Sequence, residues 1–176
     1  MNVTENRKQL AAAATRKSLE TRKKFGCSLW DAICVFDLAE RIGLEVRFWD
    51  IPSMEGIYYR ADAPSVIVSS LRPPGRQAFT CAHEIGHHVF NHGEQFDELI
   101  EERKEARRFD PCEYQADIFA EFLLMPKGAV TRALSVRDLT ADKYTPETLY
   151  AVSTWFGVGY STFVNHMSWT LLRLDQ

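Results

Sequence analysis

Apolar positions recur at helical spacing through most of the chain and alternate in short runs only near its middle. Near the start, residues 6–24 predict an exposed helix, and residues 28–42 predict an amphipathic helix that Ser28 caps and Gly43 ends. Five later segments with the same periodicity predict helices at residues 77–90, 112–124, 127–137, 146–156 and 160–172. The pattern is that of a helix-rich chain.

Three short runs rich in Val, Ile, Tyr and Phe interrupt this helical pattern. They predict strands at residues 44–49, 56–60 and 65–69, separated by Pro, Ser and Asp residues typical of turns. We therefore expect an α+β fold with a small three-stranded antiparallel sheet packed near the helix at 77–90. The third strand directly precedes that helix, and we expect it to be an edge strand able to hold an extended peptide.

The length of 176 residues, with 45% of them hydrophobic, fits one domain that buries a substantial core. We expect a single domain over residues 1–176, with a basic N-terminal helix at 1–25, a core at 26–130 and a C-terminal helical hairpin at 131–176. Residues 94–110 are densely charged and predict a mobile connector or an exposed helix.

Charge argues against a nucleic-acid binder. The formal net charge is −3, and the only local basic excess, in residues 1–25, is typical of a solvated helix face. Residues 146–172 have the rhythm of a helix-turn-helix, but the second helix offers almost no Lys or Arg before Arg173. We expect a structural hairpin there and no direct contact with nucleic acid.

The compartment follows from the cysteines and from the N-terminus. The four cysteines form no C-x-x-C pair, the first ten residues are polar, and no apolar run is long enough to span a bilayer. These features predict a protein of the reducing cytoplasm that makes no membrane contact.

Four of the five histidines lie within ten residues, and they contain the pattern H-E-x-x-H at positions 83–87. On a helix, residues four apart share a face, so His83 and His87 can direct their imidazoles at one ion while Glu84 reaches a water beside it. Neutral imidazoles with a carboxylate are typical ligands of zinc. A second pair at the same spacing, His88 and His92, lacks a carboxylate partner, so we expect exposed polar side chains there.

A catalytic zinc site needs a third protein ligand and one open position. Glu113, in the predicted helix at 112–124, is the favoured candidate, and Asp117 one turn later could accept a hydrogen bond from a ligating histidine. The reverse assignment, with Asp117 as the ligand and Glu113 as its support, stays open. Ala116 and Ala120 are small enough to let the two helices approach closely.

Two blocks of sequence resemble the signatures of the ImmA/IrrE family of zinc metallopeptidases. The first runs from Arg76 to His88, and the second runs from Glu113 to Pro126 through Ala116 and Asp117. The resemblance implies a zincin-like, specifically gluzincin-like, domain with His83, His87 and Glu113 as zinc ligands and Glu84 as general base. It also implies a bacterial or phage origin and a link to helix-turn-helix transcriptional repressors.

The expected function is that of a zinc-dependent endopeptidase that hydrolyses a specific protein or peptide substrate, with a helix-turn-helix repressor as the target that the resemblance implies. The alternative is a non-cleaving, metal-bound protein that recognises such a regulator through the same cleft. The intact Glu84 favours cleavage, since a pure binder needs no general base. An oxyanion donor is usual in such sites, and four residues remain candidates for it: Tyr58, Tyr59, His88 and His92. The sequence assigns no oligomeric state.

Overall fold

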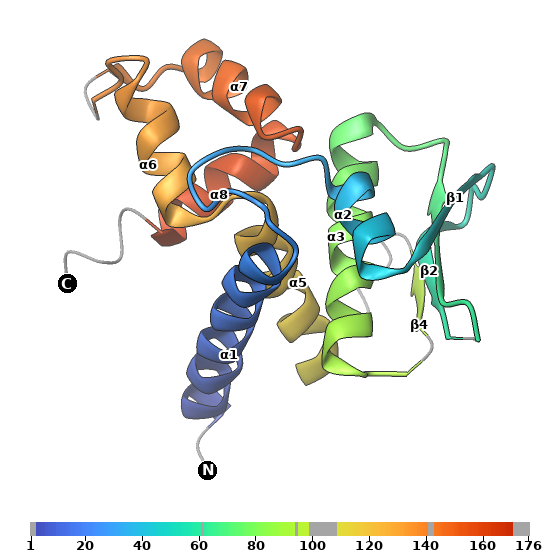
Figure 1. Cartoon of the computed structure of the whole chain (residues 1–176). Helices are drawn as coiled ribbons and strands as arrows, with labels where there is room; N and C mark the ends of the chain where they lie inside the picture. The colour runs from blue at the N-terminus through green and yellow to red at the C-terminus, as the bar shows by residue number, and fades with distance from the viewer. Residues whose placement is uncertain (1–2, 61, 94, 99–108, 141–142, 171–176) are drawn as a thin grey trace.

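The computed structural model describes residues 3–60, 62–93, 95–98, 109–140 and 143–170 and confirms a helix-rich α+β architecture (Figure 1). The helices are α1 (Val3–Lys24), α2 (Val35–Ile42), α3 (Pro74–Phe90), α5 (Pro111–Leu124), α6 (Lys127–Ser135), α7 (Pro146–Trp155) and α8 (Tyr160–Thr170). The strands are β1 (Glu45–Trp49), β2 (Met54–Tyr59), β3 (Ser65–Ser69) and β4 (Gln95–Glu98).

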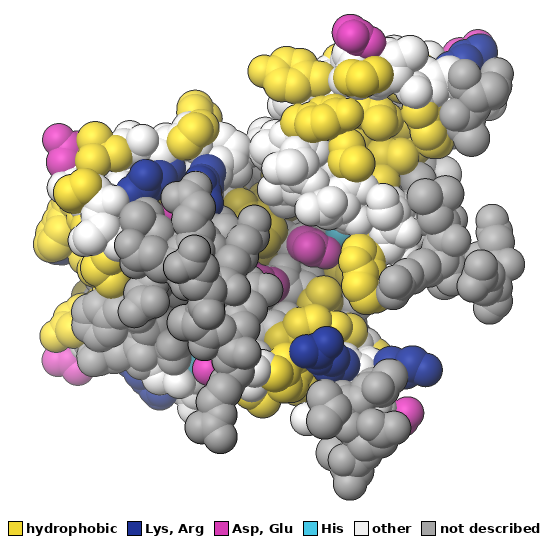
Figure 2. Space-filling model, turned by 180° about the vertical axis from the view of Figure 1, so that it is seen from behind, with side chains coloured by type: hydrophobic (Ala, Val, Ile, Leu, Met, Phe, Trp, Pro, Cys, Tyr) yellow, Lys and Arg dark blue, Asp and Glu magenta, His cyan; other side chains and the backbone are white. Residues whose placement is uncertain are grey.

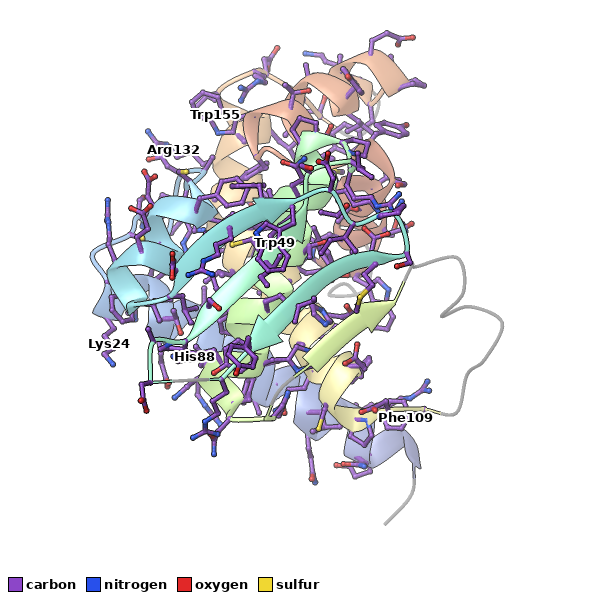
Figure 3. All side chains as sticks on the ribbon, turned by 90° about the vertical axis from the view of Figure 1, so that its right-hand side faces the viewer. Lys24, Trp49, His88, Phe109, Arg132 and Trp155 are labelled. Carbon is purple, nitrogen blue, oxygen red and sulfur yellow. The ribbon has the colours of Figure 1, made fainter. Side chains whose placement is uncertain are left out.

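The sheet differs in detail from the predicted three antiparallel strands. The described part has four strands in the order β1-β3-β2-β4, and it is mixed because β1 runs parallel to β3. The fourth strand, β4, lies within the segment at 94–110 that was expected to be a connector; residues 94 and 99–108 of that segment lie outside the described residues. Seen from the sheet side, the helices lie behind the strands (Figure 3).

The prediction that the strand at 65–69 lies at an edge of the sheet is wrong, because β3 lies in the interior between β1 and β2. All five of its residues are buried. A continuous apolar run such as Val66-Ile67-Val68 is typical of a strand covered on both faces, whereas a half-exposed edge strand alternates. Among the described strands, β1 and β4 form the two edges.

Helix α3 packs on β2 and β3 on one side and on α5 on the other. Its first turn starts at Pro74, where a missing N–H costs no helical hydrogen bond. Where α3 meets α5, a Cβ on Gly86 would lie 3.2 Å from Ala116 Cα and 3.2 Å from Phe119 Cδ1. The glycine therefore permits a close approach of two helix backbones, and Ala116 supplies the small partner that the sequence predicted.

Helix α2 begins at Val35, seven residues later than predicted, and Ser28 does not cap it. The reason is the fully buried Arg22 of α1, whose guanidinium donates to the carbonyls of Ser28 and Asp31 and to that of Leu123 at the end of α5. These carbonyls are directed at the guanidinium of Arg22 in a segment that is not helical. The Ser28 hydroxyl oxygen instead accepts the N–H of Trp30 within a loop.

Helix α1 is less exposed than its charge suggested. One face, which includes Ala14 and Ser18, is buried, and the helix packs along α5 (Figure 1). Burial lowers the pKa of Arg22 to about 10, so the guanidinium still carries its charge at pH 7. This charge links α1, the loop after it and the end of α5.

The C-terminal helices α7 and α8 follow one another and pack together; residues 171–176 lie outside the described residues. The turn between them meets the start of α3 so closely that a Cβ on Gly75 would lie 2.7 Å from the backbone nitrogen of Gly159. The buried His166 joins α8 to α5, with Nε2 2.7 Å from the carbonyl oxygen of Met125 and Nδ1 3.3 Å from Glu121 Oε2. None of the described helices is both long and apolar enough to cross a bilayer.

We predict that Arg22→Met lowers the free energy of unfolding by about 3 kcal/mol, because methionine fills much of the volume but leaves buried carbonyl groups without donors. Urea denaturation followed by circular dichroism measures the loss. Lys23→Met, an exposed position on the same helix, is the control and should change stability by less than about 0.5 kcal/mol. Equal stability of the two variants would contradict the structural role of Arg22.

Candidate metal centre

Two histidines of α3 and one glutamate of α5 converge on a common point. His83 Nε2 lies 2.9 Å from His87 Nε2, and the Glu113 carboxylate oxygens lie 3.4 Å from each of these nitrogens. Ligand atoms around a tetrahedral zinc ion, at bonds of about 2.0–2.1 Å, are separated by about 3.3 Å. Within the described residues, these three side chains form the group whose spacing suits a metal ion.

Helix spacing and a local cap bring the three side chains together. The histidines are one turn apart on α3 and buried, and Glu113 lies in the first turn of α5. Asp110 fixes that turn, because its side chain accepts the N–H groups of Cys112 and Glu113. This cap was not predicted, although an Asp before Pro in the sequence is a recognisable helix start.

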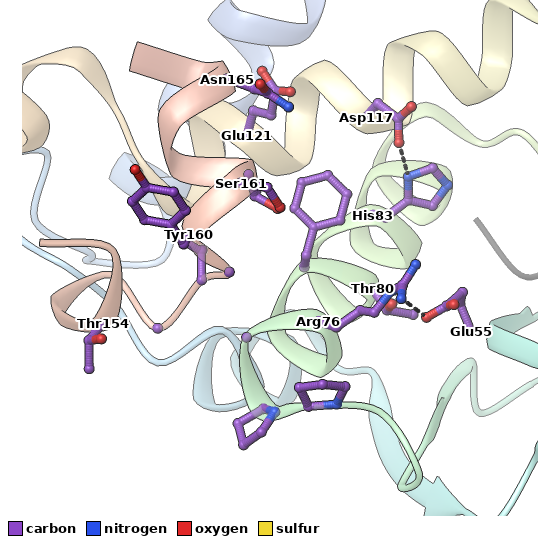
Figure 4. A pocket seen from close by; sticks show the side chains of 18 of the residues that line it. Glu55, Arg76, Thr80, His83, Asp117, Glu121, Thr154, Tyr160, Ser161 and Asn165 are labelled. Carbon is purple, nitrogen blue, oxygen red and sulfur yellow. Dashed lines mark ion pairs between the residues drawn. The ribbon is translucent and has the colours of Figure 1, made fainter. Parts of the chain in front are cut away.

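The outer nitrogen of His83 faces Asp117. Asp117 Oδ1 lies 2.9 Å from His83 Nδ1, in the arrangement expected of a carboxylate that orients a ligating ring (Figure 4). When Nδ1 donates its proton to this carboxylate, the Nε2 of a neutral ring carries the lone pair. The geometry thus favours Glu113 over Asp117 as the third candidate metal ligand beside the two histidines.

The outer nitrogen of His87 faces His92, a contact that the sequence analysis missed when it expected His92 to be exposed. The two Nδ1 atoms are 3.1 Å apart, and His92 Nε2 lies 3.2 Å from Gln115 Oε1. Because an amide oxygen only accepts, His92 donates through Nε2 and accepts through Nδ1. His87 then donates through Nδ1, which leaves the lone pair of its Nε2 directed at the common point.

Burial is the main reason why the pKa of His92 is lowered, which supports the neutral ring that this chain of hydrogen bonds requires. The lone pairs of His83 Nε2 and His87 Nε2 then face each other beside the Glu113 carboxylate. A cation stabilises such a set of acceptors, and three N and O ligands of this kind suit zinc. The residues present therefore fit the metal that the sequence implied.

Glu84 is fully buried on the sheet side of α3. A Cβ on Gly56 of β2 would lie 3.0 Å from Glu84 Oε1 and 2.4 Å from a methyl carbon of Thr80. The glycine in β2 thus makes room for the carboxylate between strand and helix. Any side chain at position 56 would displace the Thr80 methyl group and crowd the Glu84 carboxylate.

His88 was also expected to be exposed, but it is part-buried. Its Nδ1 lies 2.8 Å from the Tyr58 hydroxyl oxygen. His88 and His92 have different partners, so they do not form the second metal pair that their spacing allowed. The open cleft beside His83 is lined by none of the four candidate oxyanion donors. The role of oxyanion donor therefore stays unassigned.

The cleft extends from the metal-ligand cluster to the C-terminal hairpin and has a volume of about 870 Å³. Its walls include His83 and Asp117 at one end and residues of α7 and α8, such as Tyr150 and Tyr160, at the other. In the space-filling view, acidic and histidine side chains lie in the hollow in the middle of this face (Figure 2).

Comparison with known proteins gives two findings. The family model Peptidase_M78, described as the IrrE N-terminal-like domain, matches residues 39–168. A solved chain described as a Mycobacterium tuberculosis transcriptional regulator has a TM-score of 0.56 and 21% sequence identity, so the likeness concerns the fold alone. The match covers 96% of this chain and 48% of that one, so this chain spans about half the length of the regulator. No curated protein matches the chain.

We predict one zinc ion per chain, retained through dialysis. His87→Ala and Glu113→Gln should each weaken zinc binding at least about 100-fold, because each removes a converging ligand. Elemental analysis and titration against a chromogenic chelator measure these losses. The matched controls, His88→Ala on α3 and Glu121→Gln on α5, should keep the ion. Retention of zinc by both ligand variants would disprove the site.

We also predict that His92→Ala and Gln115→Ala weaken zinc affinity about 10- to 100-fold, because each breaks the hydrogen-bond chain that fixes the tautomer of His87. The same chelator titration applies, and His88→Ala is again the control. A zinc affinity equal to that of the unmodified protein in both variants would mean that His87 needs no support from this chain.

Proposed function

The chain belongs to the Peptidase_M78 family of IrrE N-terminal-like domains, and on this premise we propose that it is a zinc-dependent endopeptidase acting on a specific protein substrate. The observation that carries the proposal is the convergence of His83, His87 and Glu113, with the buried Glu84 following His83 in the sequence. A metallopeptidase-like fold with this donor set has the parts that amide hydrolysis requires.

His83, His87 and Glu113 would hold the zinc ion through Nε2, Nε2 and carboxylate oxygens. Zinc supplies a Lewis acid for the substrate carbonyl and lowers the pKa of a water toward about 7. Asp117 and His92 keep the two imidazoles in the ligating tautomer, as their distances of 2.9 Å and 3.1 Å to the Nδ1 atoms indicate. Three protein ligands leave an open position for substrate.

Glu84 is proposed as the general base. It follows His83 directly in the chain, and its carboxylate is packed against β2 at Gly56. A carboxylate there takes a proton from the attacking water and passes it to the leaving amine nitrogen. Its burial excludes bulk water, which strengthens the electrostatic interactions within the site.

A peptide substrate would lie in the cleft between α3 and the C-terminal hairpin. Because β3 is interior, any peptide held by strand addition would pair with an edge strand, and β4 is the described edge on the β2 side. The expectation of a helix-turn-helix repressor as substrate rests on the family resemblance. The similar solved chain, itself named a transcriptional regulator, agrees with a setting in gene regulation.

The alternative function is recognition of such a regulator without cleavage. The cleft and the cluster would serve either function, but a binder has no chemical need for the buried Glu84. We therefore favour catalysis, and the choice is decided by a variant that keeps the metal and loses the base.

We predict that the zinc-loaded protein cuts a helix-turn-helix repressor from its own genome and that Glu84→Gln lowers the cleavage rate at least about 100-fold while keeping zinc. Mass spectrometry of the new N-terminus, sampled over time, measures the rate. Glu40→Gln, which replaces an exposed carboxylate on α2 outside the cleft lining, is the matched control. A stable complex with no cut in the unmodified protein would establish the binding function instead, and neither cut nor complex across such repressors would overturn the proposed substrate class.

A further inference from the structure

A bulge in β2 directs a buried carboxylate into the cleft. In the pairing of β2 with β4, Met54 pairs with Glu98 and Gly56 with Asp97, so Glu55 is the extra residue between them. Bulges reorient the side chain of the extra residue and are common beside active sites. Glu55 is only 2% exposed, and it lines the same cleft as His83.

Two arginines from the start of α3 and the segment before it surround this carboxylate. Arg76 Nε lies 3.2 Å from Glu55 Oε2, and Arg72 Nε lies 3.8 Å from the same oxygen. Arg72 also donates to the carbonyl of Pro52, which anchors it outside the cleft. A single carboxylate cannot neutralise both guanidinium groups, so the cluster carries a net positive charge.

Arg76 is the arginine of the cluster that faces the cleft. Its side chain lines the cleft and is 29% exposed. Among the described residues, it forms an ion pair with Glu55 (Figure 4). The contact engages the Nε edge, so the two terminal nitrogens keep their N–H groups for a ligand. A guanidinium fixed in this way matches a carboxylate through two parallel hydrogen bonds.

The position of Arg76 relates it to the metal ligands. Arg76 precedes His83 by seven residues, which is two turns of α3, so both residues share one face about 10 Å apart along the helix axis. An extended peptide covers that distance in about three residues. A group held by Arg76 would therefore lie about three residues from the bond that is cut.

We propose that Arg76, oriented by Glu55, is a subsite that binds a carboxylate of the substrate about three residues from the scissile peptide bond. This inference rests on the proposed function. The carboxylate comes either from an acidic side chain or from the carboxyl end of the chain, since both present the same two oxygens. If the ion pair only tied α3 to β2, its loss would change stability and leave ligand preference unchanged.

Hydroxamates that bind zinc test the subsite without knowledge of the substrate. Peptide hydroxamates carry Glu or Gln as the third residue, on either the amino or the carboxyl side of the zinc-binding group. A further pair on the carboxyl side has Gln throughout and ends in a free or an amidated carboxyl group after the third residue. Calorimetry on the zinc-loaded full chain gives the dissociation constant of each compound.

We expect one acidic compound to bind about 10- to 100-fold more tightly than its neutral partner, the range for a hydrogen-bonded charge pair. The ratio should fall to about one in Arg76→Gln and persist in Arg47→Gln, an exposed arginine on β1 that pairs with Glu45. Glu55→Gln should reduce the ratio by releasing Arg76. Zinc content and thermal unfolding of each variant show whether it is folded.

The outcomes separate the two proposals. A preference for Glu over Gln identifies a side-chain carboxylate, and a preference for the free carboxyl end identifies the chain terminus. Tight binding of all compounds with no acidic preference, or a preference that survives in a folded Arg76→Gln, overturns the subsite alone. Failure of every hydroxamate to bind the zinc-loaded chain overturns the proposed peptidase site, and the subsite with it.

Discussion

The close approach of α3 and α5 at Gly86 and Ala116 is the constraint on which the rest of the structure depends. The His pair comes from one helix and Glu113 from the other, so the common point exists only if the helix backbones nearly touch. With a Cβ at position 86 already 3.2 Å from Ala116 Cα, any larger side chain would push α5 outward. Glu113 and Asp117 would both move, because they stand on successive turns of that helix.

Local sequence patterns predict the parts of the site that lie within one helical turn. The H-E-x-x-H spacing places His83 and His87, and the small Ala116 indicates the helix approach. The pairing of His92 with His87 escapes this reasoning because it depends on how α3 ends. Asn91 adopts φ 61°, and the N–H of His92 returns to the carbonyl of His87, which folds the His92 ring back onto its neighbour.

Contacts between residues distant in sequence explain the expectations that failed. The predicted helix at 28–42 has good periodicity, yet its first seven residues are not helical. The guanidinium of Arg22 binds two carbonyls of that segment and one from a helix a hundred residues later. In the sheet, the antiparallel pairing of β2 with β3 joins strands that are neighbours in sequence, and it was predicted. The parallel pairing of β1 with β3 was not predicted, because it skips β2, the strand that lies between them in the sequence. Strand β4 lies in a charged stretch with no strand-like pattern, so only its pairing with β2 defines it.

The cleft joins these two kinds of structure into one surface. Its metal end is built from α3 and α5, and its other end from a hairpin whose turn meets Gly75 at the start of α3. Helix α3 is therefore the common wall: it carries the two candidate histidine ligands near its carboxyl end, Arg76 near its amino end, and the contact with the turn of the hairpin. Because one helix carries all three, the proposed substrate contacts and the candidate metal site depend on the same packing.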